Sequence, residues 1–254
     1  MEIRNIEAMW SSCINAGFLF IAAVNILGDS LYSIDVRNDQ SIQISTMTGQ
    51  QKTKTYLALG DSYTIGERVA EKDRWPVILK EELSAQGVML EDPQIVAVTG
   101  WTTDELMAGI EKEEVADTFD LVSLLIGVNN QYRGRDVEEY RKEYNQLLDM
   151  AVRFAGGKSS NVFVLSIPDW GATPFAKDRD QQAIAREIDI YNQVKKDETV
   201  KRYIPFIDIT GISRQAKSDP ELIADDGLHP SGKMYKLWVD EIMKQIPDKL
   251  GLIK

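Results

Sequence analysis

Short apolar runs alternate with amphipathic segments from Thr55 to the end of the chain. The apolar runs predict five strands, which are Tyr56–Leu59, Gln94–Val98, Leu121–Ile126, Asn161–Ile167 and Tyr203–Ile209. Segments with helical spacing or a capping residue predict five helices, which are Trp75–Ala85, Thr103–Lys112, Val137–Phe154, Gln181–Lys196 and Ser231–Ile246. Because strands that alternate with helices are joined by right-handed crossovers, the pattern predicts a doubly wound α/β domain with a parallel sheet over residues 54–254.

Residues 1–53 do not follow this alternation. Their apolar stretch, Ala16–Leu27, is shorter than the roughly 20 residues that cross a bilayer, so we expect no stable membrane insertion. It has the length of a secretion-signal core, but Glu2 and Glu7 outweigh Arg4 where a signal carries positive charge. The poor match favours a cytoplasmic location over a periplasmic or secreted one.

The segment Ser33–Lys54 is polar and shows no sustained pattern from which an element could be assigned. Three interpretations of residues 1–53 therefore stay open. They are a degenerate targeting segment, an additional strand packed on the domain, or a start assigned too early, with Met47 as the first residue of the protein.

Charge and rare residues exclude several classes of function. The 254 residues carry 40 Asp and Glu against 29 Lys and Arg, a net charge of −11 that disfavours nucleic acids and anionic membranes as partners. The single cysteine, Cys13, excludes an intrachain disulfide and a CxxC site, and the single histidine, His229, excludes the common zinc sites. Because G-x-G-x-x-G is also missing, we expect neither a metal nor a nicotinamide or flavin cofactor.

Chemically useful residues follow the predicted strands. Ser62 comes after the first strand, Gly100 after the second and Asn129 after the third, while Asp226 lies three residues before His229. Ligands of doubly wound sheets bind at the carboxyl ends of the strands, so these residues are expected to meet there. A serine, a base, an acid that orients the base and hydrogen-bond donors for an oxyanion are the components of nucleophilic acyl transfer.

Four blocks in this order, GDSYTIGE, VTGWTT, GVNN and DDGLHP, resemble those of the SGNH hydrolase (GDSL esterase/lipase) family, over Lys54 to the C-terminus. The resemblance implies a flavodoxin-like three-layer α/β/α fold with a five-stranded parallel sheet. It also implies that Ser62 is the nucleophile, that His229 acts as general base and then acid, and that Asp226 orients it. The implied oxyanion hole consists of the N–H groups of Ser62 and Gly100 and the side-chain amide of Asn129.

Several assignments have alternatives. Asp225 competes with Asp226 for the histidine, although the spacing favours Asp226, and Gly28-Asp29-Ser30 repeats the GDS triplet, which makes Ser30 an alternative but disfavoured nucleophile. The third block usually reads GxND, whereas this chain has Asn130 in place of the aspartate. The amide there can accept a hydrogen bond but brings no charge, so we expect little effect on the chemistry.

The expected function is that of a serine hydrolase that cleaves small carboxylic esters with short or medium acyl chains through an acyl-enzyme, without a cofactor. Arg74-Trp75-Pro76 and DDGLHP resemble the bacterial thioesterase/lysophospholipase I type. A carbohydrate deacetylase, an acyl-thioesterase or lysophospholipase, and a catalytically silent glycan- or acyl-binding module stay open. The loop Ser166–Asp180 places Trp170, Pro174 and Phe175 where they either line an acyl pocket or cover the core. The sequence leaves the oligomeric state open.

Overall fold

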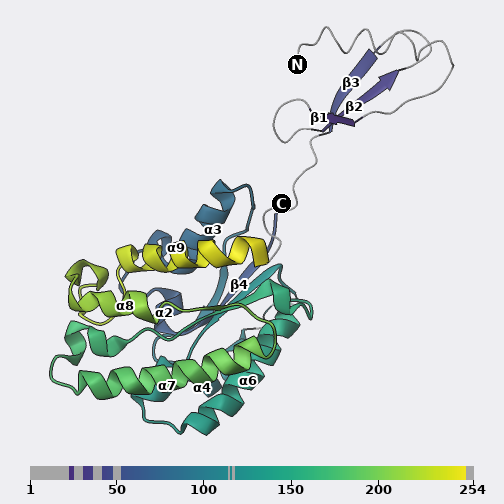
Figure 1. Ribbon diagram of the computed structural model, residues 1–254. Helices are drawn as coiled ribbons and strands as arrows, with labels where there is room; N and C mark the ends of the chain where they lie inside the picture. The colour runs from purple at the N-terminus through teal and green to yellow at the C-terminus, as the bar shows by residue number, and fades with distance from the viewer. Residues whose placement is uncertain are drawn as a thin grey trace. The chain divides into compact units, whose positions relative to one another are not determined.

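The computed structural model of the chain describes residues 53–113, 115 and 118–249, with side chains as far as residue 246, and three strands nearer the N-terminus. The chain divides into two units, Met1–Lys52 and Thr53–Lys254 (Figure 1). Each unit has a sheet of its own.

The first unit contains an antiparallel sheet of three strands, Ala23–Asn25 (β1), Leu31–Val36 (β2) and Ile42–Met47 (β3). No element could be assigned from the sequence over Ser33–Lys54, whereas β2 and β3 occupy part of that segment. The missed signal is a short alternation of apolar and polar residues in both strands, whose register pairs Ile34 with Ile44. The triplet Gly28-Asp29-Ser30, and Ala16–Leu27 apart from β1, lie outside the described residues.

The second unit is built on a parallel sheet whose order is β5-β4-β6-β7-β8. Its strands are Tyr56–Gly60 (β4), Gln94–Ala97 (β5), Leu121–Leu125 (β6), Val162–Leu165 (β7) and Phe206–Ile207 (β8). This is the strand order of flavodoxin-like folds, so the predicted fold is confirmed. Every residue of β4, β6 and β7 is buried, as expected of strands covered on both faces.

Helices cover the two faces of this sheet. Figure 1 shows α3 and α9 together on one face and α4, α6 and α7 on the other, which gives three layers. The helices are Ser62–Ile65 (α2), Trp75–Ala85 (α3), Thr103–Lys112 (α4), Val128–Tyr132 (α5), Val137–Phe154 (α6), Gln181–Val200 (α7), Thr210–Ser213 (α8) and Gly232–Lys249 (α9). Six short 3₁₀ turns lie among the described residues, at Glu71–Asp73 (η2), Ser159–Asn161 (η3), Trp170–Ala172 (η4), Pro174–Ala176 (η5), Arg214–Lys217 (η6) and Pro220–Leu222 (η7).

The largest difference from the predicted elements lies between α7 and β8. The helix continues to Val200, four residues beyond the predicted end, and the strand is reduced to Phe206–Ile207. Tyr203 has a φ of 58° and is almost fully exposed, so it forms the turn after the helix and not the start of a strand. In the described part of the chain, no helix has the length and apolar character needed to cross a membrane.

Candidate active site

The turn between β4 and α2 presents Ser62. Gly60 ends the strand, and a Cβ on it would lie 2.1 Å from Thr64 Oγ1 and 2.5 Å from the carbonyl oxygen of Leu125, so only glycine fits this close approach. Asp61 caps the short helix, since its Oδ1 accepts a hydrogen bond from Tyr63 N at 3.0 Å. Ser62 is the first residue of α2, where backbone N–H groups have no acceptor within the helix.

The loop before α9 holds the only histidine against a carboxylate. His229 Nδ1 and Asp226 Oδ2 are 2.6 Å apart, and Asp226 Oδ1 accepts hydrogen bonds from the backbone N–H groups of Leu228 and His229. Burial works against the charge of Asp226, but the bond to the imidazole and the two backbone bonds outweigh it and lower the pKa of this carboxyl. Asp226 is thus the carboxylate that contacts the ring, whereas no such contact involves Asp225.

The imidazole lies beside the turn that presents Ser62. The rings of His229 and Tyr63 have centroids 5.8 Å apart, and Tyr63 directly follows Ser62 in the chain. His229 is buried, and the bond to Asp226 uses its Nδ1, so Nε2 is the nitrogen left for a further partner. The structure therefore brings the His229 loop and the Ser62 turn to the same edge of the sheet.

The side chain of Asn129 joins the helix after β6 to the loop after β5, at the predicted oxyanion site. Asn129 lies in α5, and its Nδ2 donates to the carbonyl oxygen of Trp101 at 2.9 Å. This bond uses one of the two N–H groups of the amide and leaves the other. Gly100 has a φ of 89°, a conformation that glycine adopts without strain.

Asn130, which departs from the family pattern, is fully buried and binds the first residue of α4. Its Oδ1 accepts from Thr103 N at 3.1 Å, and its Nδ2 donates to Thr103 Oγ1 at 2.6 Å. The same hydroxyl donates to Glu143 of α6. Because this hydroxyl gives its own proton to Glu143, it needs a donor at position 130. An asparagine supplies that donor, whereas an aspartate would not. The sequence analysis considered the bond that Asn130 accepts, and the structure adds the bond that it donates.

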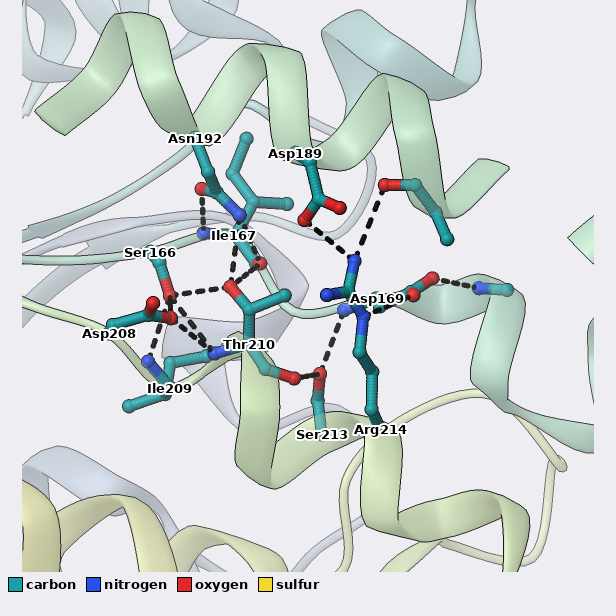
Figure 2. A network of polar contacts seen from close by, with 12 residues as sticks. Ser166, Ile167, Asp169, Asp189, Asn192, Asp208, Ile209, Thr210, Ser213 and Arg214 are labelled. Carbon is teal, nitrogen blue, oxygen red and sulfur yellow. Dashed lines mark hydrogen bonds and ion pairs between the residues drawn. The ribbon is translucent and has the colours of Figure 1, made fainter. Parts of the chain in front are cut away.

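A polar network fixes the start of the loop after β7 (Figure 2). Asn192 of α7 forms two hydrogen bonds with the backbone of Ile167, accepting from its N–H at 2.7 Å and donating to its carbonyl oxygen at 2.9 Å. Ser166 Oγ donates to Asp208 and accepts from the N–H groups of Ile209 and Thr210. The loop therefore leaves the sheet in one fixed direction.

A buried carboxylate continues this network toward the active-site edge. Asp169 is 1% exposed, and its Oδ2 lies 2.8 Å from Arg214 Nε (Figure 2). Arg214 also reaches the exposed Asp189 of α7, with Nη2 at 2.7 Å from Oδ1. The backbone N–H of Asp169 donates to Ser213 Oγ, so α8, η6 and α7 all support this one position.

Three aromatic residues, Tyr132, Trp170 and Phe175, connect the Asn129 helix with the His229 loop. Trp170 is buried, and its Nε1 donates to Gln131 of α5 at 2.8 Å. Tyr132 and Phe175 pack on it with centroid distances of 5.2 and 6.1 Å, and they keep 48% and 43% of their surface exposed. The backbone N–H of Phe175 donates to the carbonyl oxygen of Gly227, next to Asp226.

Each of our two interpretations of the 166–180 loop applies to a different aromatic residue. Trp170 belongs to the core, whereas Phe175 is exposed and its backbone bonds to the loop that holds His229. Tyr132 was not foreseen from the sequence, although it follows Asn129 by three residues and so lies one turn further along the same helix. A cavity lined by Tyr63, Trp170 and Leu228, among others, has a volume of about 10 Å³, enough for one water molecule.

The described residues contain no group of three His, Cys, Asp or Glu side chains placed to hold a metal ion. What the geometry does bring together is a serine at a helix start, a histidine bound to a carboxylate, and an amide beside a glycine loop. On a flavodoxin-like sheet, these features define a serine hydrolase of the type that forms an acyl-enzyme.

The GDSL-like lipase/acylhydrolase family model matches residues 58–237, and the chain belongs to this family. The resemblance inferred from the four sequence blocks is confirmed, and the protein is an ester hydrolase of the SGNH/GDSL type. An arylesterase from Vibrio mimicus is 24% identical over 200 residues, which are 77% of this chain and 88% of that protein.

Solved structures show the same fold. The structure of TesA has a TM-score of 0.61 at 15% identity and covers 77% of this chain and 99% of that one. A lipolytic G-D-S-L protein from Veillonella parvula has a TM-score of 0.61 at 17% identity, with 75% and 97% covered. The acetylxylan esterase Axe2 from Geobacillus stearothermophilus has a TM-score of 0.59 at 18% identity, with 81% and 99% covered.

Proposed function

We propose that this protein hydrolyses small carboxylic esters with Ser62 as nucleophile, His229 as general base and acid, and Asp226 as the group that orients the imidazole. The observation that carries the assignment is the 2.6 Å contact between His229 Nδ1 and Asp226 Oδ2, with the ring beside Tyr63. This contact fixes the proton of the neutral imidazole on Nδ1, so Nε2 is free to take the proton of the Ser62 hydroxyl.

The proposed oxyanion hole consists of the N–H of Ser62, the N–H of Gly100 and the second N–H of the Asn129 amide. The negative charge develops on the carbonyl oxygen of the ester when the serine attacks. Removing one such donor typically costs about 3 kcal/mol of transition-state stabilisation. The bond from Asn129 to Trp101 restrains the amide before substrate arrives, so little reorganisation is needed during the reaction.

The reaction then follows two balanced steps. Ser62 Oγ attacks the carbonyl carbon, its proton passes to His229 Nε2, and the same proton goes to the departing alcohol as the acyl-enzyme forms. In the second step His229 takes a proton from water, which attacks the acyl carbon, and the proton returns to Ser62 as the acid leaves. Asp226 remains ionised throughout, which agrees with its lowered pKa.

The exposed aromatic rings support a substrate with an apolar acyl or alcohol group. Tyr132 and Phe175 expose nearly half of their surface and both pack against buried Trp170. The cavity that Trp170 lines is too small for an acyl chain, so an acyl group would lie on the open aromatic surface. Because such a surface is limited in length, we propose short or medium acyl chains as the preferred substrates.

The test is hydrolysis of p-nitrophenyl esters of increasing chain length by the wild type, Ser62→Ala and Ser160→Ala. Ser160 is exposed and its hydroxyl bonds its neighbour Asn161, so it provides a matched control. We expect Ser62→Ala to lower kcat by about 10⁶-fold and Ser160→Ala to change nothing. Activity that survives in Ser62→Ala would overturn the nucleophile, and a rise in kcat/KM up to the longest chains would overturn the substrate class.

A further inference from the structure

Helix α7 carries a lysine in the core of the protein. Lys195 has no exposed surface, and its Nζ donates to the carbonyl oxygen of Ile126 at 3.0 Å. Its ammonium group lies 5.6 Å from the centre of the Tyr144 ring. Within the described residues, no carboxylate lies within ion-pair distance of this ammonium group. Lysine is almost never fully buried unless a negative charge compensates it.

A second buried charged residue, Asp61, lies near the carbonyl group that Lys195 binds. Asp61 and Ile126 directly follow Gly60 and Leu125, which are paired in the register of β4 and β6. Asp61 is 1% exposed, and its Oδ2 has no hydrogen-bond partner among the described residues, while Oδ1 caps α2. Thr64 Oγ1 and Tyr140 OH are also buried without partners there. These atoms gather at the ends of two adjacent strands, because Thr64 Oγ1 lies against Gly60 of β4 and Tyr140 OH against Gly127 just after β6.

Asp61 and Lys195 each reduce the shift that burial causes in the pKa of the other. Burial raises the pKa of Asp61 to about 7, and the bond from Tyr63 N and the charge of Lys195 act in the opposite direction. Burial likewise lowers the pKa of Lys195 to about 7, against the attraction of Asp61. The phenols of Tyr63, Tyr140 and Tyr235 also lie within the field of Asp61. With the proton on either partner, the pair has no net charge.

We propose that Lys195 and Asp61, buried at neighbouring strand ends and coupled through their charges without direct contact, position both halves of the active site, with Lys195 as a positioning residue. Asp61 caps the helix that starts at Ser62, and the Ile126 carbonyl that Lys195 binds lies three residues before Asn129. One amine therefore acts on the nucleophile turn and on the oxyanion helix. This inference rests on the proposed roles of Ser62 and Asn129.

The test is a double-mutant cycle with Lys195→Met, Asp61→Asn and the double variant, and with the exposed neighbour Lys196→Met as control. Met keeps most of the length of the lysine side chain without its charge, and Asn keeps an oxygen that can cap α2. We expect Lys195→Met to lower kcat at least tenfold with KM within twofold of wild type, because the Ile126 carbonyl loses its donor and Asp61 loses the charge that favours its ionised form beside Ser62. The double variant should regain most of the lost kcat and stability, and Lys196→Met should match the wild type.

Three outcomes would contradict the proposed coupling of Lys195 and Asp61. Additive losses in the double variant would show that the two residues do not act together. A normal kcat in folded Lys195→Met would leave the lysine with a structural role only. Failure of the double variant to fold, where Asp61→Asn folds, would also contradict pairing, which predicts that removing both charges is tolerated. Urea unfolding measures the coupling without substrate, so its result stands apart from the fate of Ser62→Ala, which tests the proposed function itself.

Discussion

Arg133 Nη2 donates to the carbonyl oxygen of Gly100 at 2.6 Å, and so binds the glycine loop to the end of the Asn129 helix. The same guanidinium group reaches Glu105 of α4 with Nη1 at 3.0 Å. Together with the bond from Asn129 to Trp101, this contact joins the two segments that supply the proposed oxyanion donors. A surface arginine therefore determines the geometry of a backbone donor that it does not itself provide.

Replacing this arginine should weaken catalysis more than binding. We expect Arg133→Gln to lower kcat about tenfold, with KM within a factor of two, because the Gly100 N–H would lose its fixed direction. Arg133→Lys keeps a donor for the carbonyl and should retain more activity. Steady-state kinetics on p-nitrophenyl acetate measures both constants. A higher KM with unchanged kcat would instead place Arg133 in substrate binding.

The two adjacent aspartates before His229 should differ in their effect on the reaction. Asp226→Asn should lower kcat by about 10³- to 10⁴-fold, because an amide there favours the wrong imidazole tautomer. Asp225→Asn removes the same charge from a side chain that does not contact the ring and should have little effect. Equal losses in the two variants would contradict the assignment of Asp226.

Asp226 should also contribute to acid stability. Its folded pKa is lowered, so the stability that it contributes is complete above the unfolded value of about 3.9 and is lost as the pH falls through the lower folded value. The gap in unfolding free energy between wild type and Asp226→Asn should therefore be present at pH 7 and shrink below about pH 4. Urea titrations at several pH values measure it, and a gap that widens in acid would contradict the sign.

Restoring the usual family residue should harm this protein. Asn130→Asp would place two carboxylates around the single hydroxyl proton of Thr103, so we expect a loss of about 1–3 kcal/mol of stability. Adding Glu143→Gln to this variant should recover much of the loss, because the glutamine amide can donate where the glutamate could not. Chemical denaturation of both variants tests the argument, and a stable Asn130→Asp single variant would refute it.

Arg214 has one buried and one exposed acidic partner, so its variants should show how burial changes the contribution of an ion pair to stability. Arg214→Gln leaves the buried Asp169 without its partner and should cost about 3 kcal/mol. Asp189→Asn removes only the exposed partner of the same side chain and should cost less than about 1 kcal/mol. Thermal unfolding of the two variants measures the ratio. Similar losses would mean that Asp169 is better solvated than its position indicates.

The apolar pattern was sufficient to predict the main sheet and its five long helices. Strands such as Leu121–Leu125 are buried on both faces and leave an uninterrupted apolar run, and α3, α4 and α6 begin and end where their patterns predict. The short helices α2 and α5 were missed because four or five residues are too few to show a period. They begin at Ser62 and Val128, so the least predictable elements are those that carry the proposed active site.

Side-chain partners from distant segments were beyond the reach of one sequence. The spacing of Asp226 and His229 predicted their contact, since both lie in one short loop. In the sequence, Lys195 looks like any other polar residue of a helix. Only the folded chain shows that it is buried and bound to Ile126, just after β6. The role of Glu143 as acceptor for Thr103, which explains the amide of Asn130, was equally unmarked.

His229 is the only histidine of the chain, and its Nδ1 lies 2.6 Å from a carboxylate whose pKa is lowered by this contact and by two backbone hydrogen bonds. The proton between them should therefore give one downfield proton resonance, in a spectral window that no other imidazole can enter. If the ring nitrogens of histidine were isotopically labelled, their signals could be assigned without mutagenesis, because the chain has one histidine. The chain thus carries a single reporter group in the proposed active site, so each step of the proposed reaction can be followed by spectroscopy on the unaltered protein.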